Sequence, residues 1–339
     1  MGQKIVIGIT QGDSNGIGYE VIIKALSDAR MLDMCVPIVY GSSRTFGMVR
    51  KQLPETEQIN TNIINSAKDA HSKRINIINA VPDTLAVEIG QPTADGAKAA
   101  IIALKAAVND LKEGSIDAIV TAPFNKHTVA CAQFSFPGHT EYLINEFGAK
   151  DGLMFLCTEH IKVGIVTNHL PLSKVSSAIT KDVILSKLRL MNSSLKRDFG
   201  CVRPKIAVLG LNPHSGDGGS LGTEEIDIII PSIEQANAEN IVAFGPYSPD
   251  GFFGTGMQYK FDAVLAMYHD QGQIALKLKG FGRGVTIGGG FQIPITTCAH
   301  GTAFDIVGKG VADSGSMKSA LKTVIHMAQS IMEQKVHSI

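Results

Sequence analysis

Residues 4–26 read KIVIGITQGDSNGIGYEVIIKAL, and this stretch indicates the fold class. Residues 4–9 form a short apolar run rich in isoleucine and valine, which is typical of a buried strand. A glycine-rich turn follows at residues 11–20, and residues 18–29 carry apolar side chains at helical spacing. A strand, a tight turn and a helix in this order form the repeating unit of α/β proteins.

The same alternation of short apolar strands and longer helical segments continues along the chain. The other expected strands are 36–40, 117–121, 154–157, 162–167, 205–210, 241–244 and 263–267, and the other expected helices are 93–111, 181–196 and 316–333. The strands at 154–157 and 162–167 are close enough in sequence to form a hairpin. We therefore predict an α/β class with a mostly parallel sheet, in which ligands bind at the carboxyl ends of the strands.

The composition excludes several classes of protein. The chain has 339 residues, and its 31 Lys and Arg balance 31 Asp and Glu, which argues against general binding of nucleic acid or a membrane surface. Five widely spaced cysteines without a CxxC pair fit reduced thiols. No signal-peptide pattern begins the sequence, and no apolar run approaches the length of a membrane span. We expect a cytoplasmic protein with no nucleic-acid or membrane partner.

Three histidines each follow a predicted strand. They are His169 in TNHLP, His214 in LNPHSGDGG and His269 in MYHDQG. Neutral imidazole is a common ligand of zinc and related divalent ions, and three protein ligands leave a coordination position open for substrate. The alternative is three unrelated polar loop residues, and the residues alone leave the two interpretations about equally supported.

Three glycine-rich stretches are candidates for ligand binding. The turn at 11–20 lacks the GxGxxG spacing of a standard dinucleotide site. Its glycines could let a substrate or cofactor approach the backbone, but a tight strand-to-helix turn is the slightly favoured interpretation. The stretch GFGRGVTIGGG (280–290) holds six glycines, which would weaken a strand or helix and indicate a loop lining a phosphate or cofactor. In AHGTAFDIVGKG (299–310) we expect a short helix that includes Asp305 and contacts a dinucleotide, with a simple capped helix start as the alternative.

Two further features could bind a negatively charged substrate group. In FPGHTEYL (136–143), His139 and Thr140 lie at a predicted helix N-terminus, where anions bind. The alternative is that Thr140 only caps the helix. Lys126, in TAPFNK after a predicted strand, is either a cation of the site or a solvated lysine.

Taken together, these motifs resemble the 4-hydroxythreonine-4-phosphate dehydrogenase family of vitamin B6 biosynthesis. The similarity runs from GITQGDSNGIGYE to HGTAFDIVGKG, and NPHSGDGG, MYHDQG and FPGHTE occur in the order of the family. The glycine-rich stretches also look like those of isocitrate and isopropylmalate dehydrogenases. The resemblance implies that fold, with residues 1–339 forming one unit of two interleaved α/β subdomains around a central cleft. It also implies a homodimer with a shared active site.

The resemblance assigns roles to individual residues. By motif, His169, His214 and His269 match metal ligands. His139, Thr140 and Lys277 match contacts to the substrate. The cofactor-side element HGTAFDI makes three residues candidates for cofactor binding: Gly301, Thr302 and Asp305.

Two positions depart from the family pattern. Thr286 stands where the family has a substrate-binding asparagine, and Ile295, in IPITTCAH, stands in place of the substrate-binding arginine of LPFIRTS. Losing an arginine removes a bidentate donor for carboxylate or phosphate. This part of the sequence looks closer to a sister group that acts on sugar-acid phosphates such as D-threonate or D-erythronate 4-phosphate.

The implied reaction is NAD-dependent oxidation and decarboxylation of a small phosphorylated β-hydroxy acid, 4-hydroxythreonine 4-phosphate at the family level. NADP is the alternative cofactor, and the expected ion is zinc, with magnesium, manganese and cobalt as alternatives. Asp270 and Lys126 are the candidates for the general base. A metal-dependent hydrolase that uses the histidines to activate water, and a non-catalytic binder of a phosphorylated metabolite, are alternatives from other classes.

Overall fold

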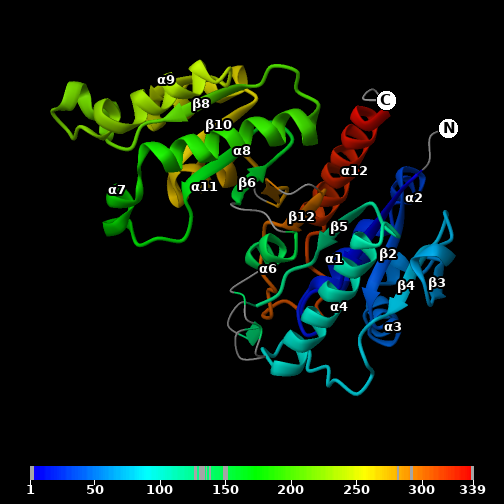
Figure 1. Ribbon diagram of the computed structural model, residues 1–339. Helices are drawn as coiled ribbons and strands as arrows, with labels where there is room; N and C mark the ends of the chain where they lie inside the picture. Colours follow the sequence, from blue (N-terminus) through cyan, green and yellow to red (C-terminus); the bar gives the residue numbers. More distant parts are fainter. Residues whose placement is uncertain are drawn as a thin grey trace. The chain divides into compact units, whose positions relative to one another are not determined.

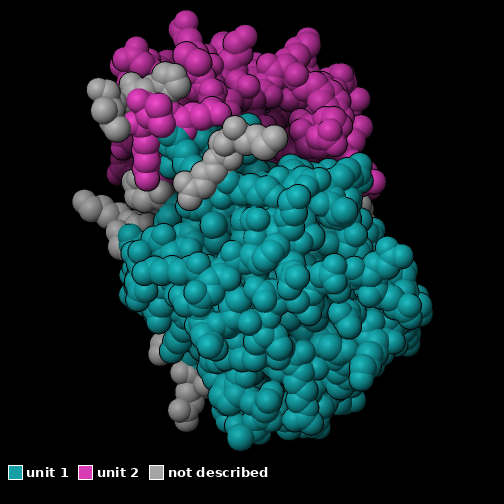
Figure 2. Space-filling model, turned by 90° about the vertical axis from the view of Figure 1, so that its right-hand side faces the viewer, with its two compact units in different colours: residues 1–148, 292–332 teal, residues 149–291, 333–339 magenta. Residues whose placement is uncertain are grey.

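The computed structural model divides the chain into two compact units. It describes residues 4–125, 128–129, 134, 136, 139–147, 152–280, 282–290 and 293–336. Unit 1 comprises Met1–Gly148 and Gln292–Met332, and unit 2 comprises Ala149–Phe291 and Glu333–Ile339 (Figure 2). Each unit is therefore built from two segments of the chain. Among the described residues, no helix has the length and apolar character needed to cross a membrane.

Unit 1 contains a parallel sheet with strand order β3-β4-β2-β1-β5-β12 (Figure 1). The strands are β1 (Ile5–Thr10), β2 (Cys35–Gly41), β3 (Thr61–Ile64), β4 (Ile75–Asn79), β5 (Ala118–Thr121) and β12 (Ile295–Cys298). Strands β2 and β5 are buried along their whole length, and β1 is buried except at Val6. A strand that is buried on both faces reads as a continuous apolar run, which is why 4–9 and 117–121 were recognisable in the sequence.

The helices of unit 1 follow its strands. They are α1 (Gly18–Leu26), α2 (Ala29–Met34), α3 (Ser43–Arg50), α4 (Ala94–Lys112), α6 (His139–Glu146) and α12 (Gly315–Val336, from Glu333 on in unit 2), with short 3-10 turns η1 (Pro54–Thr56) and η2 (Ala67–Asp69). The hydroxyls of Thr93 and Ser42 accept main-chain N–H groups at the starts of α4 and α3, as N-caps do. Helix α4 packs on β1, β2 and β5.

Unit 2 has the strand order β11-β6-β7-β10-β8-β9. The strands are β6 (Leu153–Cys157), β7 (Lys162–Thr167), β8 (Lys205–Leu209), β9 (Val242–Tyr247), β10 (Ala263–Tyr268) and β11 (Val285–Gly289). Strands β7, β10, β8 and β9 pair in parallel, whereas β6 pairs antiparallel with β7 and with β11.

The helices of unit 2 cover this sheet. They are α7 (Val175–Ala178), α8 (Lys181–Phe199), α9 (Ile230–Ala238), α10 (Pro249–Gly254) and α11 (His269–Gly280), with shorter turns η3 (Leu172–Lys174), η4 (Pro213–Gly219), the π-helical η5 (Glu225–Ile229) and η6 (Met257–Lys260). Helices α8 and α9 pack on each other, and α11 packs on β7 and β10. Phe252 of α10 and Leu276 of α11 share a buried cluster with Ile165, Leu209 and Val264 of the strands.

The structure confirms the α/β class and the strands and helices expected from the sequence, including the hairpin of β6 and β7. Two local predictions are wrong. The glycine-rich stretch 280–290 is not only a loop, because Val285–Gly289 forms β11 against β6. A Cβ on Gly289 would lie 3.1 Å from the Leu153 Cβ, so the glycine allows a close strand approach. The stretch 299–310 forms turns and not a helix, and Ala303 has a positive φ of 43°.

Gly12 is required by the turn that joins β1 to α1. Its φ is +71°, and a Cβ there would lie 2.4 Å from the main-chain oxygen of Pro123, which follows β5. The next N–H, of Asp13, donates to that same oxygen at 3.0 Å. The turn is thus held against the end of β5, and only a residue without a side chain fits at this point.

Replacing Gly12 with alanine should therefore lower the thermal unfolding midpoint. The left-handed backbone alone costs about 1–2 kcal/mol for a residue with a Cβ, and the contact with the Pro123 oxygen adds to this cost. Gly47→Ala in α3 is the matched control, because nothing lies within 4 Å of the added methyl group. Alanine's helix propensity should make that variant more stable by up to about 1 kcal/mol. Equal midpoints for the two variants would contradict this account.

Candidate active site

Three adjacent strand ends of unit 2 carry the three histidines singled out in the sequence. Strands β7, β10 and β8 are neighbours and run in parallel, with Tyr268 opposite Thr167 and Leu265 opposite Val208. His169 follows β7, His214 follows β8, and His269 follows β10 directly. Their carboxyl ends meet at one edge of the sheet, which is where α/β proteins bind ligands.

Two of the histidines lie together. The rings of His169 and His269 are 5.6 Å apart between centroids and are inclined by 40°. Two imidazoles at this separation can reach one ion, because a zinc–nitrogen bond is about 2.0–2.1 Å long. Among the residues that the structure describes, no three His, Cys, Asp or Glu side chains form a group that could hold a metal, so His214 is not grouped with this pair.

Asp270 lies beside His269 at the first turn of α11. Its Oδ1 is 2.7 Å from His269 Nδ1, and the carboxylate is largely exposed, at 72%. When Nδ1 donates its proton to this carboxylate, Nε2 carries the lone pair that a metal ligand needs. The neighbouring acid thus fixes which nitrogen of the ring faces outward.

His214 lies in a left-handed turn. His214, Ser215 and Asp217 have φ values of 52°, 53° and 43°, and Gly216 between them has 82°. Each non-glycine residue in this conformation costs about 1–2 kcal/mol, so the turn persists only where its surroundings hold it. The Ser248 hydroxyl, which donates to Asp250 Oδ1 at 2.6 Å, and the Gly251 N–H lower the pKa of Asp250, and His214 adds a smaller contribution in the same direction.

Glu225 holds the start of this turn, a role that could not be recognised from the sequence alone. Its side chain is 1% exposed, and Oε1 accepts the main-chain N–H groups of Leu211 and Asn212, each at 2.7 Å. The Asn212 side-chain amide donates to Oε2 at 2.9 Å. A Cβ on Gly216 would lie 2.8 Å from the same Oε2, so the left-handed turn closes directly over the carboxylate.

Buried polar atoms without a hydrogen-bond partner lie next to two of the histidines. Asn168 Oδ1 precedes His169, and Ser215 Oγ follows His214; neither finds a partner within the described part of the chain. Buried polar atoms are almost always paired, and exceptions gather at catalytic sites and ion sites. These two atoms fit an edge that binds a polar ligand.

In unit 1, the stretch 299–310 packs against the turn after β1. Ile17 N–H donates to the Thr302 oxygen at 3.0 Å, and a Cβ on Gly16 would lie 3.0 Å from Thr302 Cβ. Thr302 is buried, whereas Gly301 and Asp305 are exposed.

His300 was not selected from the sequence, but its Nε2 is buried and has no partner among the described residues. This segment could therefore face a ligand, because it carries the exposed Asp305 carboxylate, the open backbone of Gly301 and the unpaired His300 nitrogen.

The turn itself buries an acid. Asp13 is fully buried; its Oδ1 accepts the N–H of Asn15 at 3.0 Å, and its Oδ2 has no partner in the described residues. Burial raises the pKa of Asp13, and the Asn15 N–H only partly opposes this shift. The acid lies at the start of α4, because a Cβ on Gly96 would be 2.4 Å from Asp13 Oδ1.

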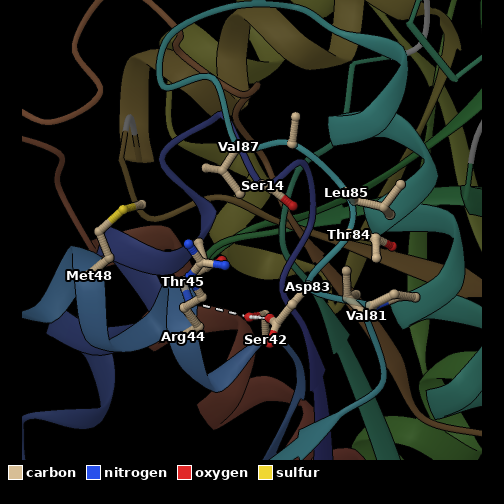
Figure 3. A pocket seen from close by; sticks show the side chains of 12 residues that line it. Ser14, Ser42, Arg44, Thr45, Met48, Val81, Asp83, Thr84, Leu85 and Val87 are labelled. Atoms are coloured by element: carbon tan, nitrogen blue, oxygen red, sulfur yellow. Dashed lines mark hydrogen bonds between the residues drawn. The ribbon is translucent and has the colours of Figure 1, made fainter.

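A hollow of about 270 Å³ lies beside this turn, at the carboxyl ends of β1, β2 and β4. Figure 3 shows Ser42, Arg44 and Asp83 on one side of it and Leu85 on the other. Ser42 Oγ donates to Asp83 Oδ1 at 3.2 Å. The hollow is a second candidate binding region of unit 1, because a cationic and an anionic side chain face it.

The remaining predicted site residues lie in separate parts of the chain. Lys277 is exposed on α11, eight residues after His269 and thus about 12 Å along the helix axis. His139 and Thr140 begin α6, as the sequence predicted, but their side chains lie outside the description. Lys126 lies outside the described residues altogether.

Of the two altered positions, Thr286 lies in β11 opposite Leu156. Ile295 lies in β12, is 2% exposed and packs in the core. The register predicted for Ile295 is wrong, because the arginine of LPFIRTS is the third residue after the proline, and the third residue after Pro294 is Thr297. Thr297 lies nearer the carboxyl end of the strand, and its Oγ1 accepts the Thr121 hydroxyl at 2.9 Å.

Glu225→Gln should destabilise the edge that carries His214. Glutamine keeps one acceptor but turns an NH2 group toward N–H donors, which leaves buried donors unpaired at a cost of about 1–3 kcal/mol. The measurement is the thermal unfolding midpoint, with Glu234→Gln as the matched control, since Glu234 is exposed on α9. The control should stay within about 0.5 kcal/mol of the unaltered protein. A Glu225 variant as stable as this control would refute the bracing role.

Comparison with known proteins identifies relatives over almost the whole chain. The family model of the pyridoxal phosphate biosynthetic protein PdxA matches residues 33–324. A Bacteroides thetaiotaomicron protein named 4-hydroxythreonine-4-phosphate dehydrogenase is 45% identical, over 98% of this chain and 91% of the relative. A Symbiobacterium thermophilum protein, provisionally named a D-threonate 4-phosphate dehydrogenase, is 36% identical over 95% of this chain and 96% of its own length.

Solved structures agree with this similarity. The 4-hydroxythreonine-4-phosphate dehydrogenase of Klebsiella pneumoniae superposes with a TM-score of 0.86 at 35% identity, covering 96% of this chain and 99% of that chain. A terephthalate 1,2-cis-dihydrodiol dehydrogenase of Burkholderia xenovorans, at 21% identity and a TM-score of 0.64, shares the fold. The chain is thus an oxidoreductase, and it belongs to the PdxA family of pyridoxal phosphate biosynthetic proteins.

Proposed function

We propose that this chain catalyses the NAD-dependent, metal-assisted oxidation and decarboxylation of 4-hydroxythreonine 4-phosphate. The observation that carries the proposal is the placement of His169, His214 and His269 at the ends of three adjacent parallel strands. The names of the relatives support the substrate, since several of them are 4-hydroxythreonine-4-phosphate dehydrogenases. Small phosphorylated substrates suit an edge where strands end and helices begin.

His169, His214 and His269 are the proposed ligands of one divalent ion. The 5.6 Å separation of the His169 and His269 rings supports the shared role of these two. Imidazole ligands favour zinc, with cobalt, manganese and magnesium as alternatives in decreasing preference for nitrogen. When bound, the ion supplies Lewis acidity to the substrate oxygens. The protein's own part is to hold the rings in place, and Asp270 does this for His269 by orienting Nδ1.

Gly301, Thr302 and Asp305 are the proposed contacts to the cofactor, NAD or NADP. The exposed carboxylate of Asp305 can accept ribose hydroxyls, and the open backbone at Gly301 lets a ligand approach closely. The unpaired Nε2 of His300 adds a polar group on the same segment. When bound, the cofactor accepts the hydride.

The substrate's charged groups are proposed to bind His139, Thr140 and Lys277. The N-terminus of α6 favours an anion at His139 and Thr140, and the exposed ammonium of Lys277 suits a phosphate or carboxylate. Asp270 and Lys126 remain the two candidates for the base that takes the hydroxyl proton. Asp270 has the supporting geometry, because it is exposed and contacts His269.

A homodimer with a shared active site is also proposed, on the family resemblance. Exposed apolar side chains near the histidine-bearing segments support a subunit contact in this part of unit 2: Leu170 at 44%, Leu172 at 73%, Leu221 at 46% and Ile226 at 47% exposure. The segments that carry them are joined, since the Ser176 hydroxyl donates to Glu224 Oε1 at 2.6 Å. A fully active monomer in sedimentation would contradict this proposal.

The proposed compartment is the cytoplasm. Cys35, Cys157, Cys201 and Cys298 are free thiols, and Cys131 lies outside the described residues. Burial raises the pKa of Cys35, Cys157 and Cys298 to about 12, so these thiols are poor nucleophiles and stay reduced easily. Unpaired, inert thiols fit a reducing compartment.

A second substrate class is favoured by the altered positions. Thr286 and Thr297 stand where the family has an amide and a guanidinium, so neither position offers the bidentate anion donor of the family pattern. Together with the relative named for D-threonate 4-phosphate, this supports D-threonate or D-erythronate 4-phosphate as the alternative substrate. A metal-dependent hydrolase remains the alternative of another class, and it would turn over substrate without reducing NAD.

Replacing His269 or His169 with alanine should remove the bound ion and lower kcat/KM by at least about 100-fold, because even neighbours of metal ligands contribute 10–100-fold. Elemental analysis measures metal per chain, and NAD reduction measures activity. His160→Ala is the control, since His160 is exposed on the turn between β6 and β7. Full metal occupancy in both active-site variants would refute the assignment of ligands.

The ratio of kcat/KM values for 4-hydroxythreonine 4-phosphate and D-threonate 4-phosphate tests the substrate. We expect the amino substrate to be preferred in the unaltered enzyme, with NAD reduced in step with substrate loss. Thr297→Arg should raise kcat/KM for both anions, since it restores a charged donor. A strong preference for D-threonate 4-phosphate would favour the sister-group activity, and substrate loss without NAD reduction would favour a hydrolase.

A further inference from the structure

A series of hydrogen bonds crosses the carboxyl ends of the three strands that carry the histidines. Thr167 Oγ1, at the end of β7, donates to the Met267 oxygen of β10 at 2.8 Å. The Met267 N–H donates to Gln271 Oε1 at 2.7 Å, and Gln271 Nε2 donates to the Gly210 oxygen at 2.8 Å. One hydroxyl and one amide side chain therefore join β7, β10 and the end of β8.

This series begins where the ordinary sheet pairing stops. The parallel pairing of β10 with β8 ends at Leu265 and Val208. Beyond that point, the side chain of Gln271 provides the link between the two chain segments, and Gly210 is held on its other side by the Tyr247 oxygen. The link lies two residues before His269 on one strand and four residues before His214 on the other.

Only an amide of this length can make both contacts. Gln271 accepts with one atom and donates with the other, so a carboxylate could not satisfy the Gly210 oxygen and an apolar side chain would satisfy neither group. Met267 is fully buried and Gly210 is buried, so groups left unpaired there find no water. The structure thus makes the two segments depend on this one side chain.

We propose that Gln271 is a positioning residue that sets the spacing of His214 relative to His269. It lies in the same first turn of α11 as His269, and it pulls the segment that leads into the His214 turn toward β10. In the same way, the Thr167 hydroxyl holds the end of β7, and with it His169, against β10. The inference rests on the proposed function, in which these histidines hold one ion, and it adds the residues that fix their geometry.

The test compares metal binding with stability in the full-length protein. Gln271→Met keeps the length of the side chain and removes both hydrogen bonds, and Thr167→Val removes only the β7 link. The metal-free proteins are titrated with Co²⁺, whose visible absorption bands report the geometry of its ligands, and thermal midpoints are measured separately. Gln58→Met is the matched control, because Gln58 is exposed in unit 1.

Gln271→Met should bind Co²⁺ about 10–100-fold more weakly, with shifted bands, as expected for a group that orients metal ligands. Thr167→Val should shift the Co²⁺ bands to a smaller degree. Thr167→Ser, which keeps the hydroxyl, should show the same bands as the unaltered protein. A Gln271 variant that melts earlier but binds Co²⁺ with unchanged affinity and bands would overturn the positioning role. His269→Ala with unchanged Co²⁺ binding would instead refute the metal site, and with it this inference.

Discussion

Parallel pairing of β7, β10 and β8 brings three strand ends to one edge, and the candidate metal site depends on this arrangement. Neighbouring strands lie about 4.8 Å apart, so side chains just past the ends of β7 and β10 start close enough to share a ligand. His169 and His269 use this directly, with rings 5.6 Å apart. A shift of one strand by one residue would turn its side chains to the other face and separate them.

The third histidine needs a different support. The turn around His214 is left-handed over consecutive residues, a conformation that local sequence does not favour. The buried Glu225 carboxylate compensates by accepting the N–H groups of Leu211 and Asn212, and Gln271 of α11 donates to the Gly210 oxygen of the same segment. The strained backbone therefore lies at the candidate metal site. Polar contacts outside that site offset the cost of the strain.

Burial determines which elements of this fold can be predicted from the sequence. Strands such as 4–9 and 162–167 are mostly buried and mostly apolar, so their pattern was clear, and His169 was found by its position after the second of them. β11 was missed because pairing with β6 and close packing of Gly289 on Leu153 outweigh the poor strand propensity of glycine. The turns at 299–310 were missed because Lys24 of α1 binds the Gly310 and Ala312 oxygens, a contact between distant residues.

Glu225 escaped detection for a similar reason. In TEEIDIII it has the sequence context of a surface acid, and only the folded chain brings it to the N–H groups of Leu211 and Asn212. Gln271 was quoted within MYHDQG, but nothing local indicates that its amide reaches Gly210, 61 positions earlier. Residues that touch a ligand carry recognisable chemistry in sequence, whereas residues that position them acquire their role from tertiary contacts.

Thr297, one of the two altered positions, shows how such contacts bear on the proposed specificity. A buried donor aimed at a substrate group discriminates strongly, because it goes unpaired when the group is absent. Thr297 is not in that state, since its hydroxyl is already paired with Thr121 of the neighbouring strand at 2.9 Å. Removing the substrate group therefore leaves no unpaired atom at this position. In the proposed site, Thr297 would weaken anion binding without itself discriminating between an amino and a hydroxy substrate.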